Sequence, residues 1–264
     1  MFHRILIPTD FSTASEWVFD DAVRIAATSG GEVIILHVRM TWTDHPDELR
    51  FPADPSLYEY VEQQELERLR ERVRESSLVR TRLIVRQAPD PGDEICRTAT
   101  RENADLIVIA THARHHVAHL IVGSTTVSVL TDPPTPVLAI RYGIRKRAQL
   151  NRIVVPVHLE QDSRAALDLA AGVGREIHLL TICDDGSRPR AEKLHRELAA
   201  GIKNAKSHIV RGSDAQKEIV KYTTKSDADA IFLNAHNEPS EGKLDIIRNA
   251  PVPVMIVPAV SSRA

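Results

Sequence analysis

A glycine followed by three hydroxyl residues marks the segment of this sequence best suited to bind an anion. Gly123 precedes Ser124, Thr125 and Thr126, where the pattern predicts the start of a helix. Free amides and the helix dipole attract anions there, and glycine lets a ligand approach the backbone. Arg114 could hold the same phosphate with its forked guanidinium. An ordinary helix cap after a glycine turn would look alike, but the position after a predicted buried strand favours an anion site.

Asp10 lies in a second loop, residues 8–12, directly after an apolar run at residues 5–7. An aspartate at the carboxyl end of a strand can accept hydrogen bonds from a ligand or help to hold a divalent cation. Asp10 and Ser12 could equally do no more than cap the next helix. Taken alone, this loop favours the capping alternative.

Four histidines lie in one short segment just before the glycine. They are His112, His115, His116 and His119. Spacings of three and four residues would place three of them on one helix face, and imidazole binds zinc, nickel or copper. No cysteine or carboxylate lies near them in the sequence. We therefore favour the alternative in which these side chains line a loop or contact a phosphate, and we predict no metal site.

Five short apolar runs in the first half predict the strands that position these loops. They cover residues 5–7, 33–38, 83–85, 106–109 and 137–140. Their continuous, β-branched pattern is typical of parallel strands buried on both faces. Helices are predicted to begin with a capping box at residues 13–16, at Asp54-Pro55, at Asp93 and at Ser124. This alternation predicts an α/β fold with a doubly wound open sheet, which binds ligands beyond the carboxyl ends of its strands.

The whole pattern occurs twice. The run at residues 4–8 recurs at residues 152–156, and the matches continue in order to the final runs at 136–140 and 253–257. Intermediate matches pair Glu32-Val33 with Glu176-Ile177, Val85-Arg86 with Val210-Arg211, and Ala104-Asp105 with Ala228-Asp229. Because chance rarely produces such collinear order, we predict two domains, residues 1–143 and 149–260. The basic run at 144–147 is expected to be a solvated linker.

Length and composition exclude several classes of protein. The chain has 264 residues, of which 42% are hydrophobic and 27% charged, an ordinary profile for a globular protein. A net charge of −2 gives no overall signature for nucleic acid or an anionic membrane. No apolar run approaches the roughly 20 residues that span a bilayer. Cys96 and Cys183 form neither a disulfide framework nor a zinc site. Because no signal peptide opens the sequence, the expected location is the cytoplasm.

Four segments together make the chain similar to a tandem universal stress protein, in which two such domains are fused. They are residues 5–12, residues 104–114, the Gly123-Ser124 pair and residues 136–140. The resemblance extends over nearly all of both copies. It implies two Rossmann-like, five-stranded parallel sheets of the adenine-nucleotide α-hydrolase type, paired as a pseudo-dimer. The implied pairing joins residues 137–140 to residues 254–257 as antiparallel edges that would otherwise be exposed.

The resemblance also implies an adenine-nucleotide site in the first copy. Nucleotide-binding members carry Gly-x-x-Gly-x9-Gly-[Ser/Thr] after the fourth strand, and here the same spacing reads Ala110, Ala113, Gly123 and Ser124. If residue 113 needs a positive φ, its Cβ costs on the order of 1–2 kcal/mol and blocks a phosphate, whereas at negative φ alanine is nearly harmless. The implied contacts are Thr9, Asp10 and the Val38 backbone to adenine and ribose, and Ala110, Ala113, Arg114, Gly123, Ser124 and Thr125 to ribose and phosphates.

The second copy departs from this pattern. His158 stands in place of Asp10, and Val157 in place of Thr9. From the end of the fourth run to the proline of the last run the first copy has 26 residues and the second 19, so seven residues and the Gly-Ser pair are missing. Glu238 and Glu241 would repel a phosphate if they pointed inward. The second copy is predicted not to bind nucleotide in the family manner and to serve pairing and regulation.

We therefore expect a cytoplasmic stress-response protein that binds ATP, ADP or AMP, with or without magnesium, in its first domain. Two chains are expected to form a homodimer, with protein partners of unknown identity. One alternative is a scaffold that binds other proteins and no nucleotide. Another is a slow ATPase with Asp10 beside the phosphates, although the sequence contains no P-loop lysine, no Gly-x-Ser-x-Gly elbow and no dedicated base. Whether the protein is an enzyme stays open.

Overall fold

The first half of the chain alternates strands and helices, as its apolar runs predict. The computed structural model describes residues 2–40, 55–75, 79–111, 122–144, 150–235 and 241–258. The elements of the first half are β1 (Arg4–Thr9), α1 (Thr13–Trp17), α2 (Phe19–Ala27), β2 (Glu32–Met40), α3 (Pro55–Glu75), β3 (Arg80–Ala88), α4 (Pro91–Arg101), β4 (Leu106–Thr111), α5 (Ser124–Thr131) and β5 (Val137–Arg141).

The second half repeats this order with one helix after its first strand instead of two. Its elements are β6 (Arg152–Pro156), α6 (Arg164–Val173), β7 (Glu176–Cys183), α7 (Arg188–Ala199), β8 (Ala205–Arg211), α8 (Ala215–Lys225), β9 (Ala230–Asn234), α9 (Glu241–Asn249) and β10 (Val254–Val257). The repeat that the sequence shows is therefore a repeat of structure.

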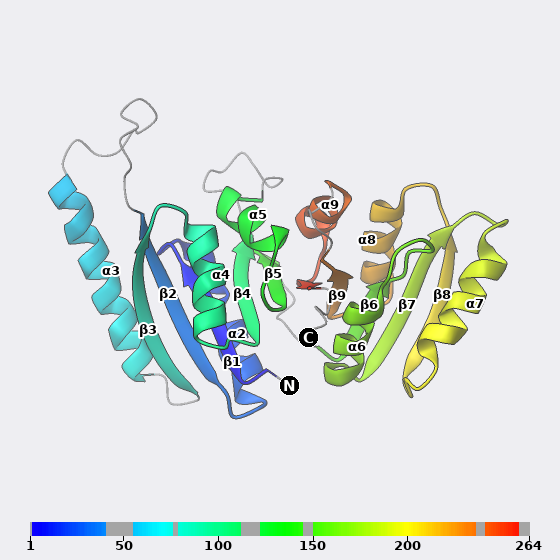
Figure 1. Cartoon of the computed structure of the whole chain (residues 1–264), viewed down its shortest axis with the longest axis horizontal. Coiled ribbons are helices and arrows are strands. Elements are labelled where there is room, and N and C mark those ends of the chain that lie inside the picture. The colour runs from blue at the N-terminus through cyan, green and yellow to red at the C-terminus, as the bar shows by residue number, and fades with distance from the viewer. Residues whose placement is uncertain are drawn as a thin grey trace.

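The ten strands in the described ranges form one sheet, in the order β3-β2-β1-β4-β5-β10-β9-β6-β7-β8 (Figure 1). Neighbouring strands within each half are parallel, which confirms the doubly wound five-stranded arrangement. The halves meet through β5 and β10, which are antiparallel, with Val254 opposite Ala139 and Ile256 opposite Val137. The predicted pairing of the last strands is thereby confirmed.

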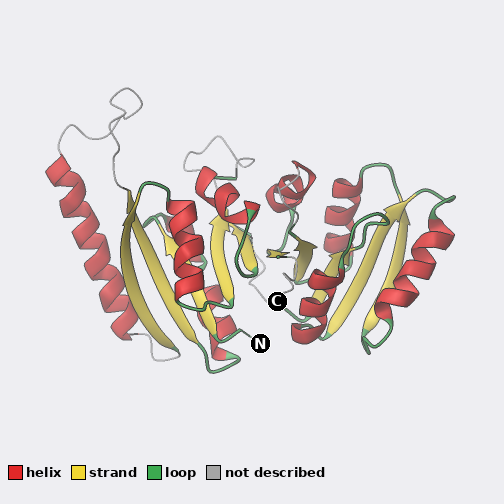
Figure 2. Ribbon diagram, viewed as in Figure 1, coloured by secondary structure: helices red, strands yellow, loops and turns green. Residues whose placement is uncertain are grey.

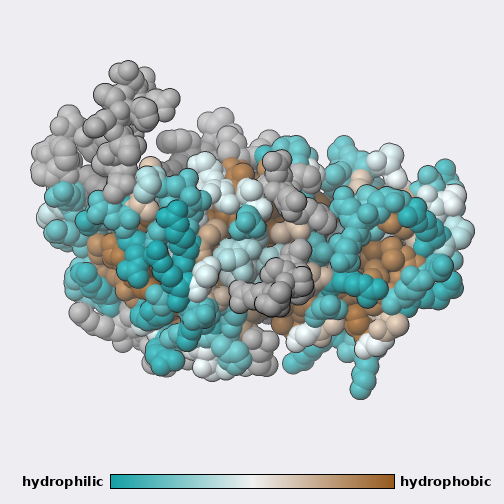
Figure 3. Space-filling model, viewed as in Figure 1, coloured by the Kyte–Doolittle hydropathy of each residue, from teal (hydrophilic) through white to brown (hydrophobic). Residues whose placement is uncertain are grey.

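Apolar side chains form a core layer on each face of the sheet. Along β1, Ile5 and Ile7 enter one layer and Leu6 enters the other, and all three are buried. Helices α2, α3, α6 and α7 contribute to the first layer, and α4, α5, α8 and α9 to the second. Figure 2 shows helices on both sides of the strands. The face of the molecule drawn in Figure 3 is mainly hydrophilic and has several smaller hydrophobic patches.

Helix α1 begins differently from the sequence prediction. Its N-cap is Ser12, whose hydroxyl accepts a hydrogen bond from the Ser15 amide at 3.3 Å. Thr13 is already helical, so the capping box predicted at residues 13–16 is wrong by one position. Ser12 takes the cap because it has the extended backbone that this position requires, φ −70° and ψ 151°. The helix is also interrupted at Val18, which separates α1 from α2.

The structure matches β3 with β8 one residue away from the match that the sequence predicts. His37 on β2 pairs with Val85, and its counterpart Thr181 on β7 pairs with Ile209. Val85 therefore matches Ile209 and not Val210, so the predicted match of Val85-Arg86 with Val210-Arg211 is wrong by one residue. A one-residue shift reverses the face of every side chain in a strand, so counterparts in β3 and β8 must be taken from the register.

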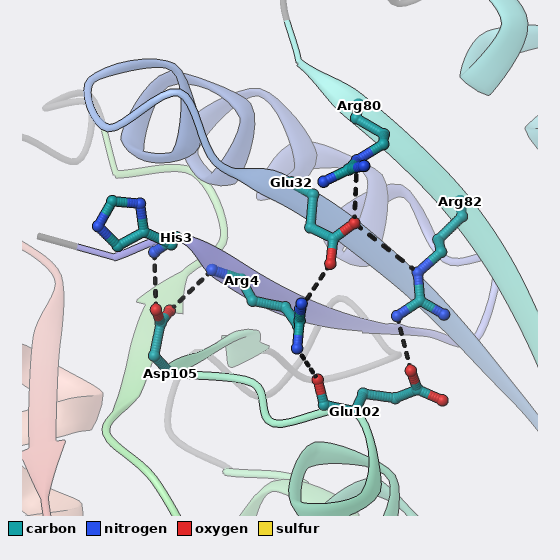
Figure 4. A network of polar contacts seen from close by, with 7 residues as sticks. All are labelled: His3, Arg4, Glu32, Arg80, Arg82, Glu102 and Asp105. Carbon is teal, nitrogen blue, oxygen red and sulfur yellow. Dashed lines mark hydrogen bonds and ion pairs between the residues drawn. The ribbon is translucent and has the colours of Figure 1, made fainter.

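A network of charged side chains fixes the amino ends of β1 and β2 (Figure 4). The Arg4 guanidinium lies 2.5 Å from the Glu32 carboxylate and donates to the Glu102 carbonyl oxygen at 2.7 Å. Asp105 accepts hydrogen bonds from the backbone amides of His3 and Arg4, at 2.7 and 3.0 Å. Arg80 and Arg82 also approach Glu32, at 3.2 and 4.0 Å.

The second half repeats this network at its own amino edge. Arg152 lies 2.9 Å from Glu176, and its amide donates to Asp229 at 2.8 Å. The left-handed turn before the fourth strand is repeated too, with φ of 50° at Asn103 and 51° at Asp227. The two halves thus share one frame at the amino edge, and their differences lie at the opposite, carboxyl edge.

Candidate functional site

The turn after β1 is held by hydrogen bonds among its own residues. The Thr9 hydroxyl accepts from the Phe11 amide at 3.1 Å and lies 3.0 Å from the Ser15 hydroxyl. Asp10 Oδ1 accepts from the Ser12 amide at 3.1 Å and from the Ser12 hydroxyl. These are the bonds that the capping alternative predicts. The Asp10 side chain is nevertheless exposed at the carboxyl edge, where a ligand can reach it.

Phe11 gives this turn an unusual backbone. Its φ is 60°, in the left-handed region, which costs a residue with a Cβ on the order of 1–2 kcal/mol. The Phe11 ring packs against the His37 ring of β2, with 4.2 Å between the ring centres. Strained backbone of this kind is concentrated at functional sites, because the surrounding contacts must hold it in place.

Behind the turn lies a buried histidine–glutamate pair that the sequence analysis did not identify. His37 Nε2 is 2.9 Å from Glu62 Oε1 of α3, and the two residues are 4% and 2% exposed. His37 Nδ1 is 3.1 Å from the Thr9 carbonyl oxygen. Arg39 also contacts Glu62, at 2.8 Å. The available signal was a histidine inside the apolar run at residues 33–38.

Glu62 also corrects the apolar face of α3, for which the near-helical spacing of the apolar residues in the sequence predicts Tyr58, Val61, Leu66, Leu69 and Val73. Leu66 and Leu69 are buried as expected, but Val61 is 50% exposed and Glu62 takes the inward position. The inward position is tolerated because His37 and Arg39 satisfy the buried carboxylate. Tyr58 and Val73, assigned to the same face, have side chains outside the described residues.

β1 is paired with β4 over a shorter length than with β2, and a doubly wound sheet binds ligands where two such neighbouring strands diverge. β1 pairs with β2 over six residues, whereas its ladder with β4 covers the Ile5–Leu106 and Leu6–Ile107 pairs at the amino ends. Ala110, near the end of β4, is level with Thr9 in this register. Val38 lies one residue beyond the last β2 partner of β1. Thr9, Val38 and Ala110 thus meet at the switch point of the sheet.

Helix α5 begins beside this point. Its N-cap is Gly123, with φ −63° and ψ 152°, and no side chain caps it. Its first turn is tied to the sheet because the Thr126 hydroxyl donates to the Ala110 carbonyl oxygen at 3.4 Å. Ser124 is exposed and Thr125 is half-buried. A Cβ added to Gly123 would meet no described atom within 4 Å, so neither strain nor crowding among the described residues requires glycine there.

Several predicted contacts cannot be placed in this geometry. Ala113 and Arg114 lie outside the described residues, as do His112, His115, His116 and His119. The backbone conformation on which the effect of Ala113 depends is therefore still a prediction. Within the described ranges, no three histidine, cysteine, aspartate or glutamate side chains form a group that could hold a metal ion.

The equivalent edge of the second half is closed by one side chain. Asn234, the counterpart of Ala110, accepts a hydrogen bond from the Ala166 amide of α6 through Oδ1, at 2.7 Å. Its Nδ2 donates to the Asp162 carbonyl oxygen, also at 2.7 Å. The Asn234 side chain therefore bridges the end of β9 to the start of α6. The alanine methyl group in the first half cannot form such a bridge.

The buried polar chain behind this second edge is also different. The Thr181 hydroxyl donates to the Val157 carbonyl oxygen at 2.7 Å and accepts from His195 Nε2 at 2.8 Å. His195 Nδ1 accepts from the Ser207 hydroxyl at 2.6 Å. Burial lowers the pKa of His195 to about 4, and the charge of His208 adds to this. A neutral His195 therefore satisfies every bond in the chain.

The cysteines offer no activated nucleophile. Burial, followed by the charge of Asp93, raises the pKa of Cys96 to about 11, and burial also raises the pKa of Cys183. Cys96 lies in an open pocket of about 350 Å³ between α4 and the turn after α5, lined by Arg97, Thr100, Arg101, Asp132 and Pro134. Both thiols are protonated at neutral pH, so neither is an activated nucleophile. No helix in the described ranges is long and apolar enough to cross a membrane.

Comparison with known proteins finds the same family by each route. Residues 1–141 match the model of the universal stress protein family. The universal stress protein MJ0577 of Methanocaldococcus jannaschii is 27% identical over 158 residues, covering 53% of this chain and 96% of that protein. A universal stress protein of Thermus aquaticus is 30% identical over 145 residues, covering 53% of this chain and all of that protein. Each relative therefore corresponds to one half of this chain.

A solved structure matches both halves together. The crystal structure of a universal stress protein from Archaeoglobus fulgidus covers 97% of this chain and 98% of its own, with a TM-score of 0.77. The sequence identity is 22%, so this similarity concerns the fold. It extends the likeness from the first half to the complete ten-stranded arrangement.

Proposed function

Since the chain belongs to the universal stress protein family, we propose that it binds an adenine nucleotide at the carboxyl edge of its first half and acts in a cytoplasmic stress response. The observation that carries this proposal is the difference between the halves at one position. The alanine side chain at position 110 cannot form a hydrogen-bonded bridge at the switch point, whereas Asn234 ties the same point to α6 in the second half. Among the described residues, the second edge has this bridge and the first does not.

In this proposal, neighbouring elements contact different parts of the nucleotide. The Val38 backbone and Thr9 face the adenine side, and the exposed Asp10 carboxylate is placed to accept hydrogen bonds from ribose hydroxyls. The free amides of α5, with Ser124 and Thr125, face the phosphates, because a helix N-terminus attracts anions. By resemblance, Ala113 and Arg114 complete the phosphate side. A magnesium ion would accompany the phosphates.

The second half serves as the structural partner in this proposal. Its closed edge and its missing Gly-Ser pair leave it without the phosphate-binding helix start of the first half. It completes the sheet by covering β5 with β10. Two complete chains are proposed to associate further as a homodimer.

Thermal melting with nucleotides tests the proposal. ATP, ADP or AMP at millimolar concentration, with and without magnesium, is expected to raise the melting temperature of the full chain. A ligand at 100 times its Kd stabilises the folded state by about 2.7 kcal/mol, or several degrees for a chain of this size. The absence of a shift for all three nucleotides would support the scaffold alternative.

A pair of glycine variants locates the phosphate. Valine suits the extended backbone of Gly123, and a Cβ there meets no described atom within 4 Å, so the unliganded Gly123→Val protein should stay folded. The added side chain should nevertheless obstruct a phosphate at the start of α5 and reduce the nucleotide-induced shift. Gly172→Ala, at a second open glycine position on α6, is the matched control and should keep the full shift. An unchanged shift in Gly123→Val would place the phosphates elsewhere.

A further inference from the structure

The buried pair of His37 and Glu62 lies directly behind the turn at residues 9–12, here called the 9–12 turn. Two atoms of the His37 ring are engaged at once: Nδ1 with the Thr9 carbonyl oxygen at 3.1 Å and Nε2 with the Glu62 carboxylate at 2.9 Å. The ring face also contacts Phe11, the residue with the left-handed backbone. His37 therefore touches the 9–12 turn at two of its residues.

The two polar contacts of His37 require an additional proton. A carbonyl oxygen can only accept a hydrogen bond, and so can a carboxylate, whereas a neutral imidazole carries a single N–H. Both bonds can therefore exist together only if the pair holds one proton more than a neutral histidine and an ionised glutamate. That proton resides either on the second ring nitrogen or on the carboxyl group.

The neighbouring charges assign the proton to the histidine. Arg39 donates from Nε to both carboxylate oxygens of Glu62, at 2.9 Å, and these bonds favour the ionised carboxylate. His37 is then doubly protonated. Other charged groups on the helices covering this face form ion pairs of their own: Glu16 and Glu65 with Arg68, Glu67 with Arg70, Asp20 with Arg72, and Asp21 with Arg24. Glu59 and Glu71 of α3 are exposed to solvent. The β3 partner of His37 is the uncharged Val85.

The second half performs the same structural task without this proton. At the His37 position Thr181 donates to the Val157 carbonyl oxygen, and neutral His195 and Ser207 complete the chain. The turn there is relaxed as well, because Leu159, the counterpart of Phe11, does not have a positive φ. The proton-dependent pair and the strained turn therefore occur together, in the half whose edge lacks the asparagine bridge.

We propose that His37, held in its doubly protonated form by Glu62, is a positioning residue for the 9–12 turn and makes ligand binding at this edge depend on a proton. The inference rests on the proposed nucleotide function. When the proton leaves, the ring keeps only one of its two hydrogen bonds. Either its bond to the Thr9 carbonyl oxygen is lost, or the Glu62 bond that holds the ring against Thr9 and Phe11 is lost. Ligand affinity therefore falls as the pH rises.

Nitrogen-15 NMR of the full chain tests the proton directly. Wild-type His37 is expected to show two protonated ring nitrogens at about pH 7, where an exposed histidine is mostly neutral. In Glu62→Gln the amide can donate to Nε2, so a neutral ring keeps both contacts, and one protonated nitrogen is expected. A neutral His37 in the wild-type protein would overturn the proposal.

Nucleotide affinity gives the second readout. From about pH 6 to about pH 9 the wild-type affinity for ATP is expected to fall by about tenfold more than that of Glu62→Gln, whose geometry no longer needs the proton. Ionisation of ATP itself affects both proteins equally. Thr181→Val, at the matching position of the second half, is the control and should keep the wild-type profile. Identical profiles for wild type and Glu62→Gln would overturn the proposal.

The two readouts separate this inference from the proposed function. If no nucleotide binds to any variant, the nucleotide proposal fails, and the ring protonation of His37 still decides whether the proton is held. The backbone signals of Asp10 and Phe11 then report the turn: they should shift as the pH rises in wild type and stay constant in Glu62→Gln. Signals that follow pH equally in both proteins would contradict a positioning role.

Discussion

At the scale of single residues, the two halves differ in the polarity of one side chain at the carboxyl edge of the sheet. Alanine at position 110 and asparagine at position 234 occupy equivalent ends of β4 and β9. The asparagine amide forms two hydrogen bonds of 2.7 Å that an alanine cannot form. A single residue type thus separates an edge that has this bridge from one that lacks it, and the proposed ligand site lies at the edge that lacks it.

His195 makes the stability of the second half sensitive to acid. Burial lowers its pKa to about 4, whereas an unfolded histidine has a pKa of about 6.5. Between these values the unfolded state binds more protons, so stability is present above about pH 6.5 and is lost as the pH falls toward 4. The pKa of His208 is lowered by burial as well and acts in the same direction.

The expected loss from this group is about 1–3 kcal/mol between pH 7 and pH 4. Urea unfolding of wild type and His195→Gln at a series of pH values measures it. The variant should be less stable at neutral pH but lose less stability on acidification, because glutamine has no proton to gain. Equal pH dependence in the two proteins would show that His195 does not carry the effect.

Residue types predicted some of these positions and failed at others. Thr9, Asp10, Ala110 and Gly123 follow strands or precede a helix, so the fold class alone brings them to one edge. His37 and Glu62 were missed because burial of a histidine–glutamate pair depends on partners from three separate elements. Hydrophobic periodicity placed Val61 inside α3 and ignored Glu62, since it assigns buried positions to apolar residues only.

At the scale of elements, a glycine sets the distance between helices α4 and α5. Gly92, in the first turn of α4, faces Ser128 of α5, and a Cβ at Gly92 would collide with the Ser128 side chain. Since α5 carries the proposed phosphate site, its position depends on this contact. Gly172 of α6 has no described neighbour within 4 Å of an added Cβ.

Gly92→Ala is therefore expected to destabilise the protein, by about 1–3 kcal/mol, because the added methyl group forces α4 and α5 apart. Gly172→Ala should be neutral or stabilising by up to about 1 kcal/mol, since alanine favours a helix. Chemical denaturation of both variants beside wild type measures the contrast. A Gly92→Ala protein as stable as wild type would mean that α5 can move without cost.

Element types followed from the sequence more readily than element boundaries. Strand positions were fixed by runs of β-branched residues that only a doubly buried strand accommodates. The cap of α1 was misplaced because Ser12, Thr13 and Ser15 can all cap a helix, and backbone geometry selects among them. The match of residues in β3 with residues in β8 was predicted one position off. The side chains of β3 are less buried than those of β1, so their hydrophobic pattern constrains the alignment weakly.

At the scale of the whole molecule, the β5–β10 junction makes the two halves one structure. Leu138 lies opposite Met255, and neither is exposed to solvent. The core layers on both faces continue across the junction, because each layer contains residues from both halves. The collinear repeat predicted this pairing only through the family resemblance; the repeated strands themselves do not specify which edges meet.

We expect the full chain to unfold in one cooperative transition. Both tryptophans, Trp17 and Trp42, lie in the first half, so fluorescence reports that half while circular dichroism reports both. The transitions seen by the two methods should coincide. Leu138→Ala should lower the free energy of unfolding that both methods report by about 2–5 kcal/mol. A fluorescence change that separates from the circular dichroism change would show that the halves unfold independently.

The antiparallel contact of β5 with β10 has a consequence for assembly. Two separate polypeptides joined through such edges would come apart on dilution, and their pairing would follow the amount of protein made by the cell. Here both edges belong to one polypeptide, in which a short segment between β5 and β6 joins the two halves and keeps the local concentration of each edge for the other high. The joined state, and any support it gives to the carboxyl edge of the first half, is therefore independent of expression level.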